Sequence, residues 1–174
     1  AAGIHFGQPS DDLTGVFLRT IIASKPSGNF LELGTGAGRA TAWMLEGMSL
    51  DSKLISVESD EALIAIAQKH LGHDSRLELI CSLGEEVIVQ LPKNNFDLIF
   101  ADTWPGKYLL LEEVLSMLQT GGLYIIDDML PQPNWPDGHE EKANKLVKLL
   151  ESRTDMLLTK LNWASGIIIA TKIK

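Results

Sequence analysis

The sequence lacks the usual marks of secreted, membrane-spanning and nucleic-acid-binding proteins. Cys81 is the only cysteine among 174 residues, so no disulfide can form within the chain and a reducing compartment is favoured. No apolar run approaches the roughly 20 residues of a transmembrane helix, and no basic-then-apolar leader opens the sequence. Lys and Arg total 15 against 23 Asp and Glu, and the net charge of -8 argues against a phosphate-binding surface. We therefore expect a cytoplasmic protein with no membrane and no nucleic-acid partner, which acts on a neutral or cationic small molecule.

The length predicts one domain that covers residues 1–174. A chain of this size can bury a sizeable core but is too short for a second domain of ordinary size. Its N-terminal helical segment, residues 1–28, is expected to start a helix at residues 9–12. The expected buried face of that helix comprises Leu13, Val16, Phe17, Thr20 and Ile21.

Hydrophobic periodicity predicts an α/β fold. Buried or alternating runs indicate strands at residues 30–33, 54–58, 76–81, 96–101, 123–126, 156–161 and 167–171. Helical periodicity indicates helices near residues 39–50, 60–71, 85–91, 111–118 and 143–150. The last two strands are joined too closely to be parallel. Five strand–helix units and this hairpin predict an open, mostly parallel sheet with helices on both faces.

The segment from Asn29 to Thr41, NFLELGTGAGRAT, joins a buried strand to a helix through three glycines at alternate positions. Glycine permits positive φ and close approach of a ligand, and the helix start offers N–H groups and a positive dipole end. Nucleotide-like ligands bind at this edge of a parallel sheet. A dinucleotide fingerprint would need a glycine at position 39, where the sequence has Arg39. A tight turn without a ligand is the alternative interpretation.

Acidic residues end three further strands at the same predicted edge. Glu58 ends the second strand, Asp102 follows the fourth, and Asp127 and Asp128 follow the fifth. From the neighbouring strand end, the carboxylate of Glu58 can accept hydrogen bonds from both ribose hydroxyls of an adenosine. A solvated acid at a strand end is the alternative interpretation of Glu58.

The order of these segments resembles that in class I S-adenosylmethionine-dependent methyltransferases, and in particular the small O-methyltransferase family that includes catechol and caffeoyl-coenzyme A O-methyltransferases. The matching segments are E-x-G-x-G-x-G from Glu32, Val57-Glu58, FDLIFADTWPGKY at residues 96–108, and residues 125–130. The closing stretch NWASGIIIATK, residues 162–172, is similar to a terminal hairpin that ordinary nucleotide-binding domains lack. The resemblance implies a Rossmann-like methyltransferase fold, with a seven-stranded sheet in the order 3-2-1-4-5-7-6 and strand seven antiparallel.

The resemblance also implies S-adenosyl-L-methionine as cofactor and methyl transfer to an oxygen of a small molecule. The implied cofactor-binding residues are Glu32, Gly34, Thr35, Gly36, Gly38, Glu58, Ser59, Ser82, Leu83, Gly84, Asp102, Trp104 and Tyr108. The implied catalytic residues are Asp102, Lys107 and Asp128, with Lys107 standing in for a family lysine expected near position 105. A homodimer is compatible with the resemblance.

The resemblance argues only weakly for a metal. Metal-dependent members bind Mg²⁺ through positions that correspond here to Asp102, Asp128 and Met129. A thioether is a poor ligand for a hard cation, so we assign no metal site and expect a divalent ion to be dispensable or weakly bound. The histidines, His5, His70, His73 and His139, show no metal-ligand spacing and are expected at the surface or in packing contacts.

Two other functions stay open on the sequence alone. One is an NAD-binding or nucleotide-binding module of the same general fold, and the other is a catalytically silent protein that binds S-adenosylmethionine. The identity of the acceptor is not encoded in a readable motif. The loop at residues 131–139, which contains Trp135, is expected to be a rigid surface connection rather than a wall of an acceptor pocket.

Overall fold

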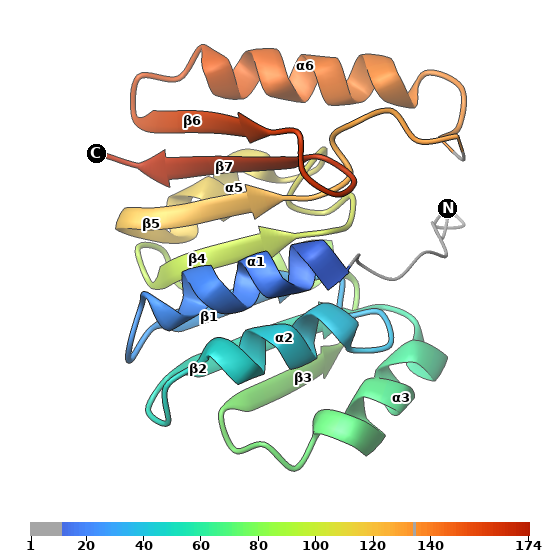
Figure 1. Cartoon of the computed structure of the whole chain (residues 1–174), viewed down its shortest axis with the longest axis vertical. Coiled ribbons are helices and arrows are strands. Elements are labelled where there is room, and N and C mark those ends of the chain that lie inside the picture. Colours follow the sequence, from blue (N-terminus) through green and yellow to red (C-terminus); the bar gives the residue numbers. More distant parts are fainter. Residues whose placement is uncertain (1–11, 134) are drawn as a thin grey trace.

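The computed structural model describes residues 12–133 and 135–174, and within these residues seven strands form one sheet (Figure 1). The strands are β1 (Asn29–Leu33), β2 (Lys53–Glu58), β3 (Leu77–Cys81), β4 (Phe96–Ala101), β5 (Leu118–Ile126), β6 (Met156–Leu161) and β7 (Ile167–Lys172). The helices are α1 (Asp12–Ala23), α2 (Arg39–Gly47), α3 (Glu61–Leu71), α4 (Gly84–Ile88), α5 (Leu111–Met117) and α6 (His139–Glu151).

The strand order is β3-β2-β1-β4-β5-β7-β6, with β1 to β5 parallel and β7 antiparallel to both β5 and β6. This order confirms the expected fold. The helix entry expected at residues 9–12 lies, except for its last residue, outside the described part of the chain.

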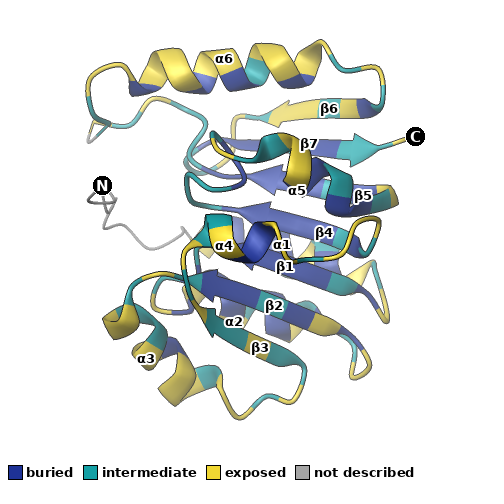
Figure 2. Ribbon diagram, turned by 180° about the vertical axis from the view of Figure 1, so that it is seen from behind, coloured by how far each residue is buried: buried dark blue, intermediate teal, exposed yellow. Residues whose placement is uncertain are grey.

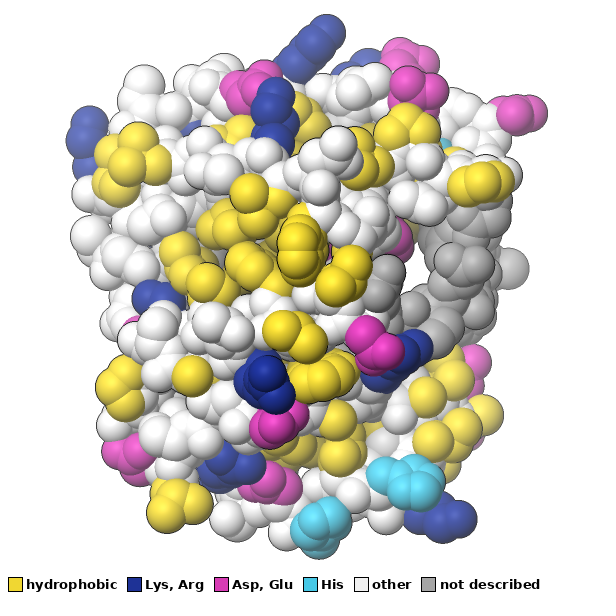
Figure 3. All heavy atoms as spheres, viewed as in Figure 1, with side chains coloured by type: hydrophobic (Ala, Val, Ile, Leu, Met, Phe, Trp, Pro, Cys, Tyr) yellow, Lys and Arg dark blue, Asp and Glu magenta, His cyan; other side chains and the backbone are white. Residues whose placement is uncertain are grey.

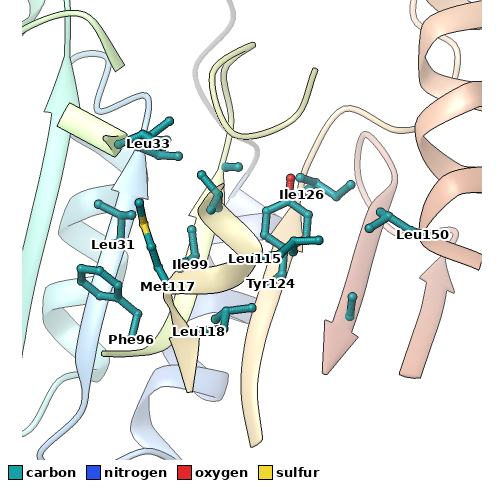
Figure 4. Packing of buried hydrophobic residues seen from close by; sticks show 14 of the residues in the cluster. Leu31, Leu33, Phe96, Ile99, Leu115, Met117, Leu118, Tyr124, Ile126 and Leu150 are labelled. Carbon is teal, nitrogen blue, oxygen red and sulfur yellow. The ribbon is translucent and has the colours of Figure 1, made fainter. Parts of the chain in front are cut away.

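Helices cover both faces of the sheet, each over its own apolar cluster. On the face seen in Figure 1, α1 and α2 pack over a cluster that includes Phe30, Leu98 and Phe100. Residues of α4, α5 and α6 join the cluster on the opposite face, part of which Figure 4 shows around Leu31 and Leu33. Successive residues of β1 therefore enter opposite clusters, which explains why this strand is a nearly continuous apolar run. Figure 2 shows the resulting burial of the central strands, with exposed outer surfaces on α3 and α6.

The α1 helix forms, but its predicted buried face is only partly right, because Phe17 and Ile21 are half-buried against the apolar cluster while the fully buried residues differ. The buried residues are Thr14, Gly15, Leu18 and Ile22. Leu13 and Val16, which were expected inside, are 45% and 38% exposed. A Cβ on Gly15 would lie 2.2 Å from the ring of Trp43, and one on Gly47 would lie 2.3 Å from a carbonyl oxygen of α1. Glycines let the two helices approach closely but carry no hydrophobic signal, so the periodicity predicts a face rotated away from the one that is fully buried.

The junction between α5 and β5 also differs from the prediction. Leu118 was expected to end the helix, but it begins a nine-residue strand instead. The pairing of β5 with β4 changes register between Phe96 and Leu98, whose partners are Leu118 and Leu123. Gly121 adopts a φ of 84° within this irregularity, a conformation that favours glycine. The Thr-Gly-Gly sequence thus bends a strand rather than capping a helix.

Apolar side chains gather above α1 on the face shown in Figure 3. Leu123, Leu161 and Ile169 are half-buried here, and the described residues place no helix over this side of β5, β7 and β6 (Figure 1). The indole N–H of Trp163 ties the turn between β6 and β7 to the carbonyl oxygen of Leu13 at 3.1 Å. Within residues 12–133 and 135–174, none of the helices has both the length and the apolarity to cross a membrane.

A buried tyrosine anchors the loop that follows β4. The hydroxyl of Tyr124 donates to the carbonyl oxygen of Gly106 at 2.5 Å, and both residues are buried. This hydrogen bond joins the middle of the loop to the neighbouring strand. The loop carries several of the predicted site residues.

Tyr124→Phe should therefore lower the free energy of unfolding by about 1 to 3 kcal/mol, because the buried carbonyl oxygen of Gly106 loses its donor. Urea unfolding of the wild type and the variant measures the difference. The matched control is Tyr108→Phe, which removes a longer contact of 3.4 Å to His139 and should cost less. Equal losses in the two variants would contradict the anchoring role of Tyr124.

Candidate active site at the carboxyl edge of the sheet

The parallel strands bring the predicted site residues to one edge of the sheet. The backbone N–H of Asp102, after β4, donates to the carbonyl oxygen of Leu33 at 2.9 Å. The N–H of Ser82, after β3, donates to the carbonyl oxygen of Glu58 at 3.0 Å. The glycine loop after β1 therefore lies between the ends of β2 and β4, as the sequence predicts.

The glycine loop is open at its centre. Gly36 has a φ of 53°, and apart from the adjoining residues 35 and 37 no atom of the described residues lies within 4 Å of the position that its Cβ would occupy. Gly34 and Gly38 differ from it, because a Cβ there would approach Asp102 at 3.2 Å and Leu71 at 2.9 Å. The outer glycines thus serve close packing, whereas the space at Gly36 is available to a ligand.

Glu58 fixes the open loop from the neighbouring strand. Its Oε2 accepts from the N–H of Gly36 at 2.9 Å, and its Oε1 accepts from the N–H groups of Ser59 and Asp60 at 2.8 and 3.0 Å. A carboxylate has about four lone-pair sites, so these three bonds leave room for a further donor. Asp60 also caps α3 by accepting from Ala62 and Leu63. Glu58 therefore combines a structural role with the capacity to bind a hydroxyl group.

Two predicted cofactor contacts, Glu32 and Thr35, lie beneath the loop rather than on its surface. Glu32 is fully buried, and its Oε2 accepts from the hydroxyls of Thr41 and Ser56, each at 2.5 Å. Thr35 is 3% exposed and shares a 2.6 Å hydrogen bond with Ser56. Burial raises the pKa of Glu32 from 4.5 to about 8, against the opposing effect of the two hydroxyls. Among the described residues Oε1 of Glu32 has no hydrogen-bond partner.

The segment after β3 forms the outer side of the site. Ser82 donates its hydroxyl to Glu86 at 2.9 Å, and Leu83 is 54% exposed. Gly84 packs against the ring of Pro105, because a Cβ there would lie 2.7 Å from Cβ of the proline. The loops after β3 and β4 thus meet beside the exposed side chain of Leu83.

Lys107 brings a positive charge to the acidic ends of β4 and β5. Its Nζ donates to the carbonyl oxygen of Asp127 at 2.8 Å and lies 3.7 Å from Oδ1 of Asp102. Burial raises the pKa of Asp128, while the charge of Lys107 opposes this change. The structure thus places the three predicted catalytic residues, Asp102, Lys107 and Asp128, in one cluster.

An aromatic cluster borders the acidic one. The rings of Trp104 and Tyr108 lie 5.9 Å apart, and that of His139 lies 5.5 Å from Tyr108 and 4.6 Å from Trp135. The ammonium of Lys142 sits 4.2 Å from the centre of the Trp104 ring. The sequence predicts only a surface or packing role for His139, because a single histidine at a helix start carries no motif. It also predicts that Trp135 belongs to a rigid surface connection, whereas in the structure both residues lie in the aromatic cluster.

Burial and nearby charge alter the titration of this aromatic cluster. Burial raises the pKa of Tyr108 to about 12, and the charge of Asp128 adds to the effect. Burial and the nearby charges of Lys107 and Lys142 lower the pKa of His139 below its ordinary value of 6.5. Tyr108 and His139 are therefore both neutral near pH 7, and the wall that they form is uncharged.

Comparison with known proteins identifies related chains. Residues 9–171 match a family model described as O-methyltransferase. A catechol O-methyltransferase of Niastella koreensis is 29% identical over 123 residues, which make up 67% of this chain and 56% of that protein. A Mycobacterium marinum protein with an O-methyltransferase name is 30% identical over 102 residues, or 55% of this chain and 45% of that one. The chain spans about half the length of the curated relatives that it matches.

Solved structures share the fold. An O-methyltransferase of Bacillus cereus in complex with S-adenosylhomocysteine has a TM-score of 0.82 at 20% identity, over 95% of this chain and 83% of that one. The O-methyltransferase TomG of Streptomyces achromogenes, in complex with S-adenosylmethionine, has a TM-score of 0.82 at 17% identity, over 95% and 82% of the two chains.

The buried carboxyl group of Glu32 should make stability depend on pH. Its pKa is about 8 in the folded protein and 4.5 when exposed, so the folded state holds a proton that the unfolded state has lost. The stability is therefore fully present below about pH 4.5 and falls as the pH rises through 8, by up to about 5 kcal/mol. Glu32→Gln should remove this dependence.

Urea unfolding at pH 5, 6.5 and 8 compares wild type and variant. The stability difference should shift in favour of Glu32→Gln as the pH rises. Glu140→Gln, at an exposed position of α6, is the control and should keep the wild-type dependence. A constant difference between Glu32→Gln and wild type would show that the buried group is ionised throughout.

Proposed function

The chain belongs to the O-methyltransferase family, and from this premise we propose that it transfers the methyl group of S-adenosyl-L-methionine to an oxygen of a small molecule. The observation that carries the proposal is the open space at Gly36 beside the carboxylate of Glu58. A nucleoside placed there would lie against the backbone at Gly36, where a Cβ would obstruct it. Its ribose hydroxyls would face the carboxylate of Glu58, which can accept hydrogen bonds from them. These residues fit the cofactor.

Other residues of the edge support the same placement. Leu83 offers an exposed apolar surface on the far side of Glu58, suited to one face of an adenine ring. Asp102 lies at the opposite end, toward Lys107 and the aromatic cluster. The edge thus provides an apolar end for a base, a carboxylate for a ribose and a charged end for the reacting groups.

When bound, the cofactor supplies a methyl group on a sulfonium, which an acceptor oxygen attacks in line. The protein's task is to hold that oxygen and to exclude water. Trp104, Tyr108 and His139 form an uncharged wall beside the acidic cluster. The acceptor hydroxyl must also lose its proton, and the raised pKa of Asp128 makes this carboxylate a better proton acceptor near neutral pH. The aromatic wall favours a phenolic acceptor.

The competing function is binding of NAD or another nucleotide. Arg39 occupies the position of the third fingerprint glycine and forms an ion pair with Asp12 at 2.7 Å. Titration calorimetry with S-adenosylmethionine, S-adenosylhomocysteine and NAD distinguishes these functions, and the adenosyl compounds should bind more tightly. Methyl transfer to a panel of phenols then separates an enzyme from a silent binding protein. We also propose a cytoplasmic location, in keeping with the free and exposed Cys81.

Glu58→Ala should weaken S-adenosylmethionine binding about 10- to 100-fold, because a charge-assisted hydrogen bond of roughly 1.5 to 3 kcal/mol is lost. Calorimetry measures the affinity. Glu61→Ala, in the exposed first turn of α3, is the control and should bind as the wild type does. Unchanged affinity in Glu58→Ala, or tighter binding of NAD than of S-adenosylmethionine by the wild type, would rule out the assignment.

Gly36→Val should abolish cofactor binding while the fold survives. The new side chain enters space free of described protein atoms, so its cost to folding is mainly backbone strain of about 1 to 3 kcal/mol. Gly121→Val is the matched control, because Gly121 also has positive φ and open space at its Cβ position but lies within β5 and not in the glycine loop. Melting curves of both variants should agree, and only Gly36→Val should lose binding. Normal binding by Gly36→Val would show that the loop is only a turn and does not contact the cofactor.

A further inference from the structure

Lys107 is a charged side chain buried within the acidic edge of the sheet. The residue is 5% exposed, and its ammonium contacts the carbonyl oxygen of Asp127 and lies near the carboxylate of Asp102. Burial of an ammonium is costly unless hydrogen-bond acceptors and opposite charge lie close to it. Asp102 supplies that charge, since its Oδ1 lies 3.7 Å from Nζ of Lys107. The acidic edge therefore contains a cation that belongs to the chain itself.

The backbone holds this cation in place. The N–H groups of residues 107–109 all donate to the carbonyl oxygen of Trp104, at 2.9 to 3.2 Å. The carbonyl oxygen of Gly106 accepts from the buried hydroxyl of Tyr124. The segment that carries Lys107 is thus a tight turn fixed to β5, and the side chain has little freedom to leave the acidic edge.

The oxygen atoms around Lys107 do not fit a divalent metal. Oδ1 of Asp127 accepts from the N–H of Asp128 at 2.8 Å and from the hydroxyl of Ser165. Met129 supplies no oxygen, and its side chain packs against an apolar cluster. In the described residues no three His, Cys, Asp or Glu side chains are grouped so that they could hold a metal ion. A divalent ion between Asp102 and Asp128 would also face the ammonium of Lys107 and be repelled.

We propose that the ammonium of Lys107 takes the place of a divalent ion at this edge, so that the protein binds no metal there. A consequence for the acceptor rests on the proposed function. A divalent ion favours acceptors with two adjacent oxygens, because both oxygens can enter its coordination shell. An ammonium has three protons, one of which is donated to Asp127, and it binds as a point charge. The acceptor class is therefore a phenol with a single hydroxyl, with no advantage for a vicinal diphenol.

The test measures binding of Mn²⁺ to the purified full chain by electron paramagnetic resonance, without cofactor or acceptor. The wild type should bind no Mn²⁺ at this edge up to millimolar concentration. Lys107→Met removes the charge but keeps an unbranched side chain, and it should bind Mn²⁺ at least about tenfold more tightly. Lys142→Met is the matched control, since it removes an ammonium that lies over Trp104, and it should behave as the wild type does.

Met129→Asn separates the lysine from the missing ligand as the reason for metal exclusion. This variant offers a third oxygen but keeps Lys107, so it should still bind no Mn²⁺. Binding of Mn²⁺ by Met129→Asn overturns the proposal, as does wild-type binding that disappears in Asp102→Asn. A folded Lys107→Met variant that binds no Mn²⁺ contradicts it as well. If Lys107→Met does not fold, the wild type and Met129→Asn decide the matter alone.

These binding measurements need no methyl transfer, so they remain valid if the proposed function fails. If transfer is found, its rates for a phenol and a vicinal diphenol should agree within an order of magnitude. Excess chelator should leave both rates unchanged. Transfer that chelator abolishes and Mg²⁺ restores would overturn the proposal while upholding the proposed function.

Discussion

Parallel pairing of β1 with β2 and β4 is the constraint on which the site depends. Leu33 lies beside Val57 on one side and Ala101 on the other, so three neighbouring strands end at the same level. The next residue of each strand or loop then enters the same space, which is why the glycine loop, Glu58 and Asp102 meet. The fifth strand reaches this level through the irregular register at its start, after which its residues pair one by one with β4 up to Ala101. The register irregularity at the start of β5 is thus followed by regular pairing that places Asp127, after β5, at the level of Asp102, after β4.

Two buried ionisable groups show opposite solutions to the cost of removing charge from water. Glu32 lies under the glycine loop among hydroxyl groups, without a cationic partner in the described residues, and burial favours its neutral form. Lys107 instead lies beside the carboxylate of Asp102 and donates to the carbonyl oxygen of Asp127. Glu32 therefore supports the glycine loop from below as an uncharged group. The arrangement around Lys107 concentrates charge where a reaction would need it.

The sequence predicted the elements that apolar patterns define and the residues at which those patterns stop. The strands, their order and the meeting of Glu58, Asp102 and Asp128 at one edge follow from runs of apolar residues that end in polar ones, together with the family resemblance. The contacts of each implied residue with a cofactor stay predictions. The features that the pattern missed depend on tertiary packing. They include the glycine contacts that determine which face of α1 is buried, and the burial of Glu32. His139 was missed as a site residue because its partners are distant in the chain.

The turn between β6 and β7 has a consequence for the time at which the site forms. The N–H groups of Met129 and Leu130 donate to carbonyl oxygens of Gly166 and Ser165 at 3.0 and 2.9 Å, and the hydroxyl of Ser165 binds the carboxylate of Asp127. These partners come after all five parallel strands in the sequence. During synthesis on a ribosome, the first five strands can leave the exit tunnel before the residues that fix the acidic edge. The five parallel strands can therefore pair before the turn that fixes this edge is available, and the order at the acidic edge is one of the last properties to appear.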